Sequence, residues 1–193
     1  MEYTFTYGNI TRKLPVYEVA GGLKIAYLDT FCDIELVNAL SSKMAQMIQD
    51  GQNFKDSQRV ILLTAVSKGV PFAYTIANNL ISLNPNKLIQ VVIARKENKK
   101  FFGSSVSVEK TSITGDGKSD ILYLAEADVN KLRGTDVILL DDMYSTGASI
   151  DALEKLARKC GAVVIDKVVA VWETADTSIQ PPVKYVAILP LIK

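Results

Sequence analysis

Short apolar runs recur along this chain, and most of them are followed by a polar loop and a helical pattern. They span residues 59–66, 88–94, 137–140, 163–171 and 184–189. The run at 59–66 (RVILLTAV) is almost continuously apolar, which suits a strand buried on both faces of a parallel sheet. Strands that alternate with helices predict a doubly wound α/β fold, with a mainly parallel sheet, helices on both faces and right-handed crossovers.

Two helices between these strands are indicated by apolar residues at helical spacing. Pro71 opens the first helix, and Gly161 ends the second. Their apolar positions are Phe72, Ile76 and Leu80 in the first, and Ile150, Leu153, Leu156 and Cys160 in the second. In a sheet of this kind the ligand binds at the carboxyl ends of the strands. We therefore expect the loops after residues 66, 94, 140 and 171 to form one site.

Residues 1–32 are predicted to form an N-terminal hairpin, or hood. Its strands would be Leu14–Val19 and Leu23–Leu28, because the Ala20-Gly21-Gly22 segment between them supplies the positive φ values that tight hairpin turns need. Asp33 is then placed to cap a helix that ends at Asp50-Gly51. The apolar stripe of that helix is Val37, Leu40, Met44, Met47 and Ile48.

A long polar segment, 96–124, separates the second predicted strand from the third and contains Gly103, Gly115 and Gly117. A loop of this length inside a compact domain is usually functional. We predict a flexible loop in which Val106-Ser107-Val108 pairs with residues 121–124 as a flap hairpin. The sequence has no internal repeat and no linker, so its 193 residues are predicted to form one domain over 1–193.

Composition excludes several classes of site. The chain has no histidine, which rules out His-based catalytic triads and His-ligated metals, and Cys32 and Cys160 are too few for a zinc site. With 22 basic and 21 acidic residues the net charge is +1, which argues against binding to nucleic acid or to a membrane surface. No run approaches about 18 apolar residues, so a soluble, cytoplasmic protein is expected.

The most specific segment is 137–150, which reads VILLDDMYSTGASI. It describes a buried strand, two adjacent carboxylates, a loop of small and hydroxylated residues, and a helix N-terminus, whose N–H groups suit an anion. Two carboxylates would repel a phosphate, but a carboxylate accepts hydrogen bonds from a sugar diol. Asp141 and Asp142 followed by Ser145–Ser149 therefore predict a ligand with a 5-phosphate and free 2- and 3-hydroxyls.

Two basic segments are expected at the same edge of the sheet. Ser67-Lys68-Gly69 directly follows the strand at 59–66. Four of the six residues from 95 to 100 are Lys or Arg; Arg95 and Lys96 lie nearest the strand end, and Lys99 lies further along. Cations at these places suit a ligand that carries several negative charges.

The segment 137–150 resembles the phosphoribosyl-pyrophosphate signature of the type I phosphoribosyltransferases. Residues 64–71 (TAVSKGVP) resemble the pyrophosphate loop of the purine members, and residues 93–96 (IARK) resemble the basic strand end before their flexible loop. The likeness is greatest to the adenine and xanthine phosphoribosyltransferase branch. Ala148 departs from the pattern, since that branch commonly has a second Gly there.

The resemblance implies transfer of ribose 5-phosphate from phosphoribosyl pyrophosphate to a purine base, with release of pyrophosphate, as in purine salvage. Mg²⁺ would be bound through the substrate, with no dedicated metal ligands. The implied ribose 5-phosphate site comprises Asp141, Asp142, Met143, Tyr144, Ser145, Thr146, Gly147, Ala148 and Ser149, of which the two aspartates are also assigned as catalytic. The implied pyrophosphate site comprises Ser67, Lys68, Gly69, Arg95, Lys96 and Lys99.

The base site is indicated less directly. Trp172 and Glu173 follow the strand at 163–171, where family members hold the purine, and Trp172 would either stack on the base or pack in the core. Oxopurine-preferring relatives tend to have a Lys after this Glu, but Thr174 stands here, so adenine is slightly favoured. The Glu-Tyr pair that adenine members carry in the flexible loop is missing, and Glu109 is assigned as its catalytic substitute.

A second class of function stays open at this point. Purine repressors of Gram-positive bacteria resemble the same core and bind phosphoribosyl pyrophosphate as an effector without catalysis. They carry an N-terminal DNA-binding domain, for which residues 1–32 are too few. The family resemblance also implies a homodimer, so the expected partners are phosphoribosyl pyrophosphate, a purine base and a second copy of the chain.

Overall fold

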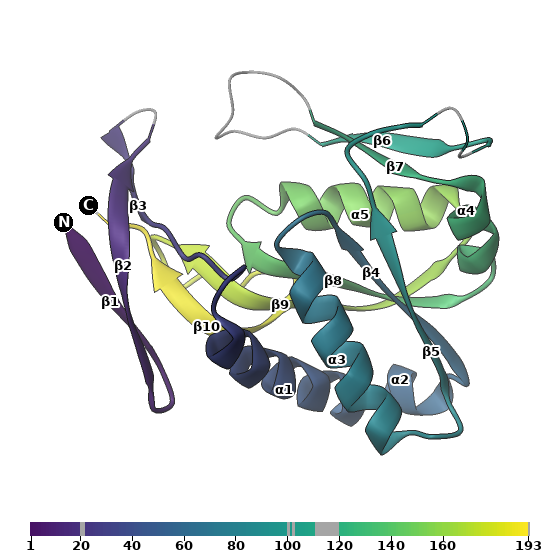
Figure 1. Cartoon of the computed structure of the whole chain (residues 1–193), viewed down its shortest axis with the longest axis horizontal. Helices are drawn as coiled ribbons and strands as arrows, with labels where there is room; N and C mark the ends of the chain where they lie inside the picture. The colour runs from purple at the N-terminus through teal and green to yellow at the C-terminus, as the bar shows by residue number, and fades with distance from the viewer. Residues whose placement is uncertain (20–21, 100, 102, 111–119, 193) are drawn as a thin grey trace.

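A sheet of five parallel strands forms the centre of the molecule, in the order β10-β9-β8-β4-β5 (Figure 1). The strands are β4 (Arg59–Ala65), β5 (Leu88–Ala94), β8 (Asp136–Tyr144), β9 (Val163–Thr174) and β10 (Lys184–Pro190). The computed structural model describes residues 1–19, 22–99, 101, 103–110 and 120–192. The α/β fold class predicted from the alternating pattern is confirmed.

Helices cover both faces of this sheet. On one face lie α1 (Ile34–Asp50) and α3 (Gly69–Leu83), with the short α2 (Gln52–Asp56) after α1. On the other face α5 (Ala148–Lys159) packs with α4 (Glu126–Leu132) and with an antiparallel hairpin, β6 (Val106–Lys110) and β7 (Asp120–Leu124). The flap hairpin predicted inside the polar segment is therefore present. The tip residues 111–119, with Gly115 and Gly117, lie outside the described residues.

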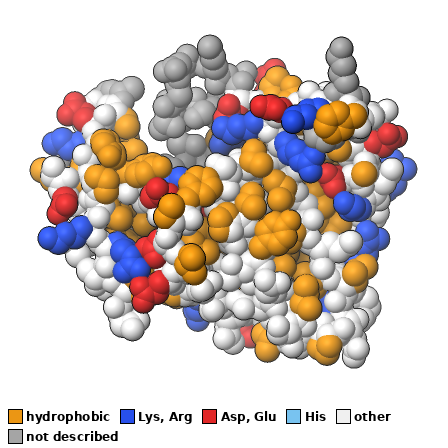
Figure 2. Space-filling view, in the orientation of Figure 1, with side chains coloured by type: hydrophobic (Ala, Val, Ile, Leu, Met, Phe, Trp, Pro, Cys, Tyr) orange, Lys and Arg blue, Asp and Glu red, His pale blue; other side chains and the backbone are white. Residues whose placement is uncertain are grey.

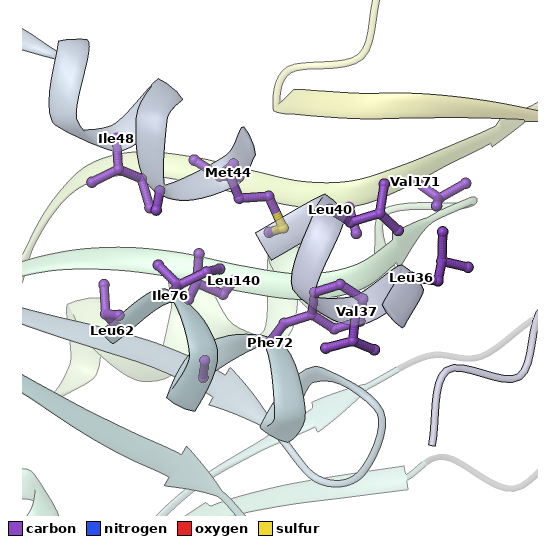
Figure 3. Close-up of a cluster of buried hydrophobic side chains, with 14 of the residues drawn as sticks. Leu36, Val37, Leu40, Met44, Ile48, Leu62, Phe72, Ile76, Leu140 and Val171 are labelled. Carbon is purple, nitrogen blue, oxygen red and sulfur yellow. The ribbon is translucent and has the colours of Figure 1, made fainter. Parts of the chain in front are cut away.

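The core between α1, α3 and the sheet is built mostly by the stripes that the sequence predicted; Leu36 was not predicted but belongs to it, and Met47, predicted as part of the stripe, is only half-buried. Leu36, Val37, Leu40, Met44 and Ile48 of α1 face Phe72 and Ile76 of α3 and the sheet residues Leu62, Leu140 and Val171 (Figure 3). Asp33 caps α1, since its carboxylate accepts a hydrogen bond of 3.0 Å from the N–H of Leu36. Such a cap stabilises a helix by about 1 kcal/mol.

A separate antiparallel sheet precedes α1. It consists of β1 (Glu2–Tyr7), β2 (Ile10–Glu18) and β3 (Lys24–Ala26), in the order β1-β2-β3. The predicted hairpin is the β2–β3 pair, in which Val16 faces Ala26; its turn residues Ala20 and Gly21 lie outside the described residues. The strand β1 was not predicted. Arg12 on β2 binds the carboxylate of Asp33 at 2.6 Å, which ties this N-terminal sheet to the start of α1.

Two strands are longer than the sequence predicted. Strand β8 continues past Leu140 to Tyr144, and β9 continues past Val171 to Thr174. The two strands remain paired up to Tyr144, which faces Trp172. Asp141 and Asp142 therefore stand on a strand end instead of in a loop, and so do Trp172 and Glu173. The sequence did not predict these extensions, because the strands were identified from continuous apolar runs and the added residues include polar ones.

Candidate ligand-binding site

The candidate site lies where strand β8 separates from β4. Strand β8 is paired with β4 only as far as Leu139, which faces Leu63, whereas β4 continues along β5 as far as Ala65. The divergence opens a pocket of about 410 Å³ at the carboxyl ends of the strands. This is the switch point of a doubly wound sheet, where ligands bind in such folds.

The pocket wall comes from six places in the chain. Four of them were predicted: the ends of β4, β5, β8 and β9. The other two are the β6–β7 hairpin, and β3 with the residues directly after it. The lining residues are Ile25, Ala26, Tyr27, Leu28, Ala65, Val66, Ser67, Lys68, Lys96, Lys110, Leu122, every residue from Asp141 to Ile150, and Glu173.

Asp141 and Asp142 form the acidic floor of the pocket. Asp141 is buried, with 7% of its surface exposed, and its Oδ1 accepts a hydrogen bond of 3.0 Å from the N–H of Asp142. Burial raises the pKa of Asp141 well above its ordinary value, and the neighbouring Asp142 carboxylate adds to the rise. Lys110 acts in the opposite direction on the pKa of Asp141. The oxygens of Asp141 and Asp142 together offer several acceptors for the hydroxyls of a sugar.

The turn after β8 brings a helix N-terminus to the pocket. Gly147 has φ +84° and stands directly before α5, and a β-carbon on it would lie 2.7 Å from the hydroxyl oxygen of Tyr144. Both the left-handed backbone and this close contact require glycine here. Because helix N-termini leave backbone N–H groups unsatisfied, the turn can accept an anion such as a phosphate.

The loop after β4 contributes a lysine that already has partners. The Lys68 Nζ donates a hydrogen bond of 3.0 Å to the backbone oxygen of Leu28 and lies 4.1 Å from the ring centre of Tyr27. Ser67 lines the pocket, and the peptide bond between Val66 and Ser67 is cis. Gly69 is buried behind the loop and is not among the described residues that line the pocket.

The basic segment after β5 is only partly at the pocket. Lys96 lines it and donates a hydrogen bond of 2.9 Å to Asp120, with about half of its side chain exposed. Arg95 and Tyr123 exchange two backbone hydrogen bonds, which attach the hairpin to the end of β5. Figure 2 shows basic side chains gathered at this edge with acidic ones among them. Among the described lining residues there is neither Arg95 nor Lys99.

Two further predicted residues lie elsewhere. Trp172 is 4% exposed and packs on Tyr185, with ring centres 5.1 Å apart, and it is absent from the described pocket lining. Glu109 is exposed on β6, and since side chains alternate along a strand, it points away from the face that carries Lys110. Glu173, by contrast, is buried and lines the pocket. The placement therefore speaks against a base-stacking Trp172 and against a catalytic Glu109.

Lys110, Tyr27 and Leu28 are lining residues that the sequence reasoning missed. Alternation within the predicted hairpin could have identified Lys110, because it shares a face with the apolar Val108. Nothing in the sequence pattern marked Tyr27 and Leu28, since their place at the pocket depends on how the N-terminal sheet packs on the domain.

The donor set at the pocket suits a metal held mainly by its substrate. Among the described residues no group of three or more Asp, Glu, Cys or His side chains stands close enough to hold a metal ion. Mg²⁺ typically takes one or two carboxylates together with substrate phosphates and water, which fits the Asp141–Asp142 pair. Within the described part of the chain, no helix has the length and apolar character needed to cross a membrane.

Comparisons with known proteins agree with this geometry. Residues 33–189 match the family model of the phosphoribosyl transferase domain. A comparison with curated protein sequences finds no match. Similar solved structures include adenine phosphoribosyltransferase from Thermoanaerobacter pseudethanolicus, with 18% identity, a TM-score of 0.59, and coverage of 92% of this chain and 94% of that one.

Two more structures have the same fold. Adenine phosphoribosyltransferase from Saccharomyces cerevisiae, complexed with an imino-altritol bisphosphate and adenine, has 21% identity and a TM-score of 0.61, over 82% of this chain and 84% of that one. An alanine variant from a study of an invariant aspartic acid in hypoxanthine phosphoribosyltransferases has 14% identity and a TM-score of 0.56, over 81% and 78%. The fold is thus shared by proteins named for different purine bases.

Proposed function

The chain belongs to the phosphoribosyl transferase domain family and is a phosphoribosyltransferase, and we propose that it transfers ribose 5-phosphate from phosphoribosyl pyrophosphate to a purine base, with adenine ahead of the oxopurines. The observation that carries the proposal is the convergence of three groups on one pocket. These are the carboxyl pair at the end of β8, the Gly147 turn before α5, and the lysines at the ends of β4 and β5. Nothing in the comparisons favours the effector-binding alternative.

Each part of the pocket fits one part of the proposed substrate. Asp141 and Asp142 would bind the 2- and 3-hydroxyls of the ribose, and Ser145–Ser149 with the N-terminus of α5 would hold the 5-phosphate. Ser67, Lys68 and Lys96 would face the pyrophosphate. Lys110 also lines the pocket, where its charge acts on Asp141, and it would add positive charge for the same ligand. Arg95, Lys99 and Gly69 are not among the described lining residues, so the proposal gives them no direct contact with the pyrophosphate.

The proposed chemistry relies on positioning. The bond from C1 of the ribose to the pyrophosphate oxygen breaks, the pyrophosphate leaves with the electron pair, and positive charge develops on the sugar. A nitrogen of the base then forms the new bond to C1, and its proton passes to the released pyrophosphate or to water. Lysines fixed at the leaving group and carboxylates at the sugar stabilise these developing charges in place, without a covalent intermediate.

Mg²⁺ belongs to the proposal through the substrate. Asp141 and Asp142 are the lining carboxylates nearest to the ribose hydroxyls in this arrangement, and phosphate oxygens would supply the other ligands. When bound, the ion would neutralise charge on the departing pyrophosphate.

The preference for adenine rests on Thr174, which stands where oxopurine-preferring relatives tend to have a Lys. Glu173 before it is buried at the end of β9 and lines the pocket, and its carboxyl oxygens can accept a hydrogen bond from the amino group of adenine. The proposal includes three further expectations. The family resemblance implies a homodimer and a role in purine salvage, and the composition favours a cytoplasmic location.

The proposal is tested by a panel of free bases. Purified protein, phosphoribosyl pyrophosphate and Mg²⁺ are mixed with adenine, hypoxanthine, guanine, xanthine, uracil or orotate, and pyrophosphate release is measured. We expect base-dependent release, fastest with adenine. Fastest release with an oxopurine would overturn the preference for adenine, and release with pyrimidines alone would overturn the purine class. Tight binding of phosphoribosyl pyrophosphate without release for any base would restore the effector-binding alternative.

A further inference from the structure

The N-terminal sheet reaches into the pocket through one aromatic ring. Tyr27 stands just after β3 and its side chain lines the pocket, with 40% of its surface exposed. Its backbone N–H donates to the oxygen of Pro15 at 2.9 Å, and its ring packs edge-on against Tyr17, with centres 6.0 Å apart. Both partners lie on β2, so the ring of Tyr27 is held in a defined place.

This ring and the next carbonyl hold the ammonium of Lys68. The Nζ atom stands 4.1 Å from the ring centre of Tyr27 and 3.0 Å from the backbone oxygen of Leu28. The negative face of an aromatic ring attracts a cation, and the carbonyl takes one of the three ammonium donors. Among the described contacts of Lys68 the other two donors have no acceptor, so they remain for an anion in the pocket.

Lysine has a long side chain with many rotamers, and holding it in one position costs conformational entropy. When an anion is bound by a lysine that moves freely, part of the binding energy is used to order that side chain. A lysine that is already held in position loses less freedom on binding, so the same contact gives a higher affinity.

We propose that Tyr27 is a positioning residue for Lys68, and that the N-terminal sheet thereby sets the affinity of the pocket for the pyrophosphate end of its substrate. The inference rests on the proposed function, because it takes Lys68 as a ligand of pyrophosphate. Tyr27 lies before residue 33, outside the residues that match the family model. The proposal therefore assigns to this chain a device that is not part of the matched domain.

A double-mutant cycle tests the proposal. Binding of inorganic pyrophosphate with Mg²⁺ is measured by calorimetry for the wild type, Tyr27→Leu, Lys68→Met and the double variant. A cation–π contact at a partly exposed site corresponds to about a 2- to 5-fold change in affinity. We expect Tyr27→Leu to weaken pyrophosphate binding by that factor, Tyr27→Phe to restore it because the ring is kept, and Tyr27→Leu to have no further effect once Lys68 is Met.

Two controls separate this role from a structural one. Tyr74→Leu removes a similarly exposed tyrosine from α3, which is not among the described lining residues, and should leave pyrophosphate binding unchanged. Binding of ribose 5-phosphate should be the same in Tyr27→Leu and in the wild type. Thermal unfolding of each variant verifies that it is folded.

The outcomes distinguish the inference from the proposed function. If Lys68→Met leaves pyrophosphate binding unchanged, the proposed role of Lys68 fails, and the inference fails with it. If Lys68→Met weakens binding but Tyr27→Leu does not, or if Tyr27→Leu has the same effect in the Lys68→Met background, only the inference is overturned.

Discussion

Gly69 packs so closely against Thr64 that a β-carbon built on Gly69 would stand 2.1 Å from Thr64 Oγ1. The same β-carbon would lie 3.3 Å from Oδ1 of Asp141. Thr64 is fully buried, and its hydroxyl has no hydrogen-bond partner among the described residues. The loop that carries Lys68 therefore packs directly against Thr64 of strand β4 and lies close to Asp141 in the pocket. Only glycine at position 69 leaves room for this close packing.

Gly69→Ala should therefore lower the free energy of unfolding by about 1–3 kcal/mol, the usual cost of overpacking a filled site. The added methyl group must displace either Thr64 or the loop. Thr64→Ala removes the oxygen that the methyl group would meet, so the pair Gly69→Ala and Thr64→Ala should recover part of the loss. Chemical denaturation of the three variants measures this recovery, and strictly additive losses would show that the two residues do not share the space.

A glycine in open space provides the control for this pair. Gly134 has φ +64°, and a β-carbon built on it would have no other atom within 4 Å. Gly134→Ala should cost about 1–2 kcal/mol through backbone conformation alone, and Thr64→Ala should not relieve any of it. A recovery there would mean that Thr64→Ala stabilises the protein in general.

Asp142→Asn should weaken binding of phosphoribosyl pyrophosphate while the fold is retained. Hydrogen bonds to a charged group are worth about 1.5–3 kcal/mol, which corresponds to about 10- to 150-fold in affinity. Calorimetry measures the change, with Asp56→Asn on α2 as a control that removes the same charge far from the pocket. Affinity equal to that of the wild type would contradict the assignment of the ribose hydroxyls to this carboxylate.

The buried Asp141 makes stability depend on pH in a defined direction. Its pKa is raised in the folded protein, chiefly by burial, so the folded state holds the proton over a pH range in which the unfolded state has lost it. The contribution of this proton to stability is complete below the unfolded pKa and is lost as pH rises through the folded pKa. The melting temperature of the wild type should fall over that interval.

Asp141→Asn is the matched variant for this dependence, because the amide keeps the shape and cannot ionise. Relative to the wild type it should gain stability as pH rises, and the difference should level off above the folded pKa. Thermal unfolding from acid to neutral pH provides the comparison. A constant difference between the two proteins at every pH would show that Asp141 titrates at its ordinary value.

The β6–β7 hairpin should respond to the phosphorylated sugar. Lys96, which follows β5, and Lys110 on β6 both line the pocket, so a ligand with several negative charges would draw the hairpin toward it. Hydrogen exchange at residues 97–99 and 106–110 should slow with phosphoribosyl pyrophosphate and Mg²⁺, and a free purine alone should do little. Equal protection by a purine alone would make the hairpin a cover for the base.

The elements that the sequence predicted well are those whose pattern is local. Strand β5 runs from Leu88 to Ala94 as expected, and the cap of α1 at Asp33 needed only one side chain and a following stripe of apolar residues. The acidic pair was placed at the right edge of the sheet for the same reason, because it directly follows a buried strand. Each of these features depends on residues that are neighbours along the chain.

What could not be predicted depends on packing between distant segments. The segment 96–124 is polar in sequence, and none of its residues was predicted to lie in the core, but Val108, Leu122 and Leu124 are buried with the apolar residues of α5. Trp172 was assigned to the pocket because it follows a predicted strand. Strand β9 instead continues through Trp172 to Thr174, and the side chain of Trp172 lies on a buried face of the strand. In a strand, a single step along the chain exchanges the two faces.

The pocket has two kinds of wall with different origins. Strands β4, β5, β8 and β9 belong to the stretch that matches the family, whereas the wall formed by Ile25, Ala26, Tyr27 and Leu28 precedes it. A relative that kept the central sheet and exchanged this front piece would retain the groups for the sugar phosphate and acquire another surface opposite them. By the two proposals above, base preference and sugar-phosphate binding belong to the matched stretch, whereas the strength of pyrophosphate binding depends on the front piece, so a graft of the first 32 residues of one such protein onto another should change the second property and leave the first.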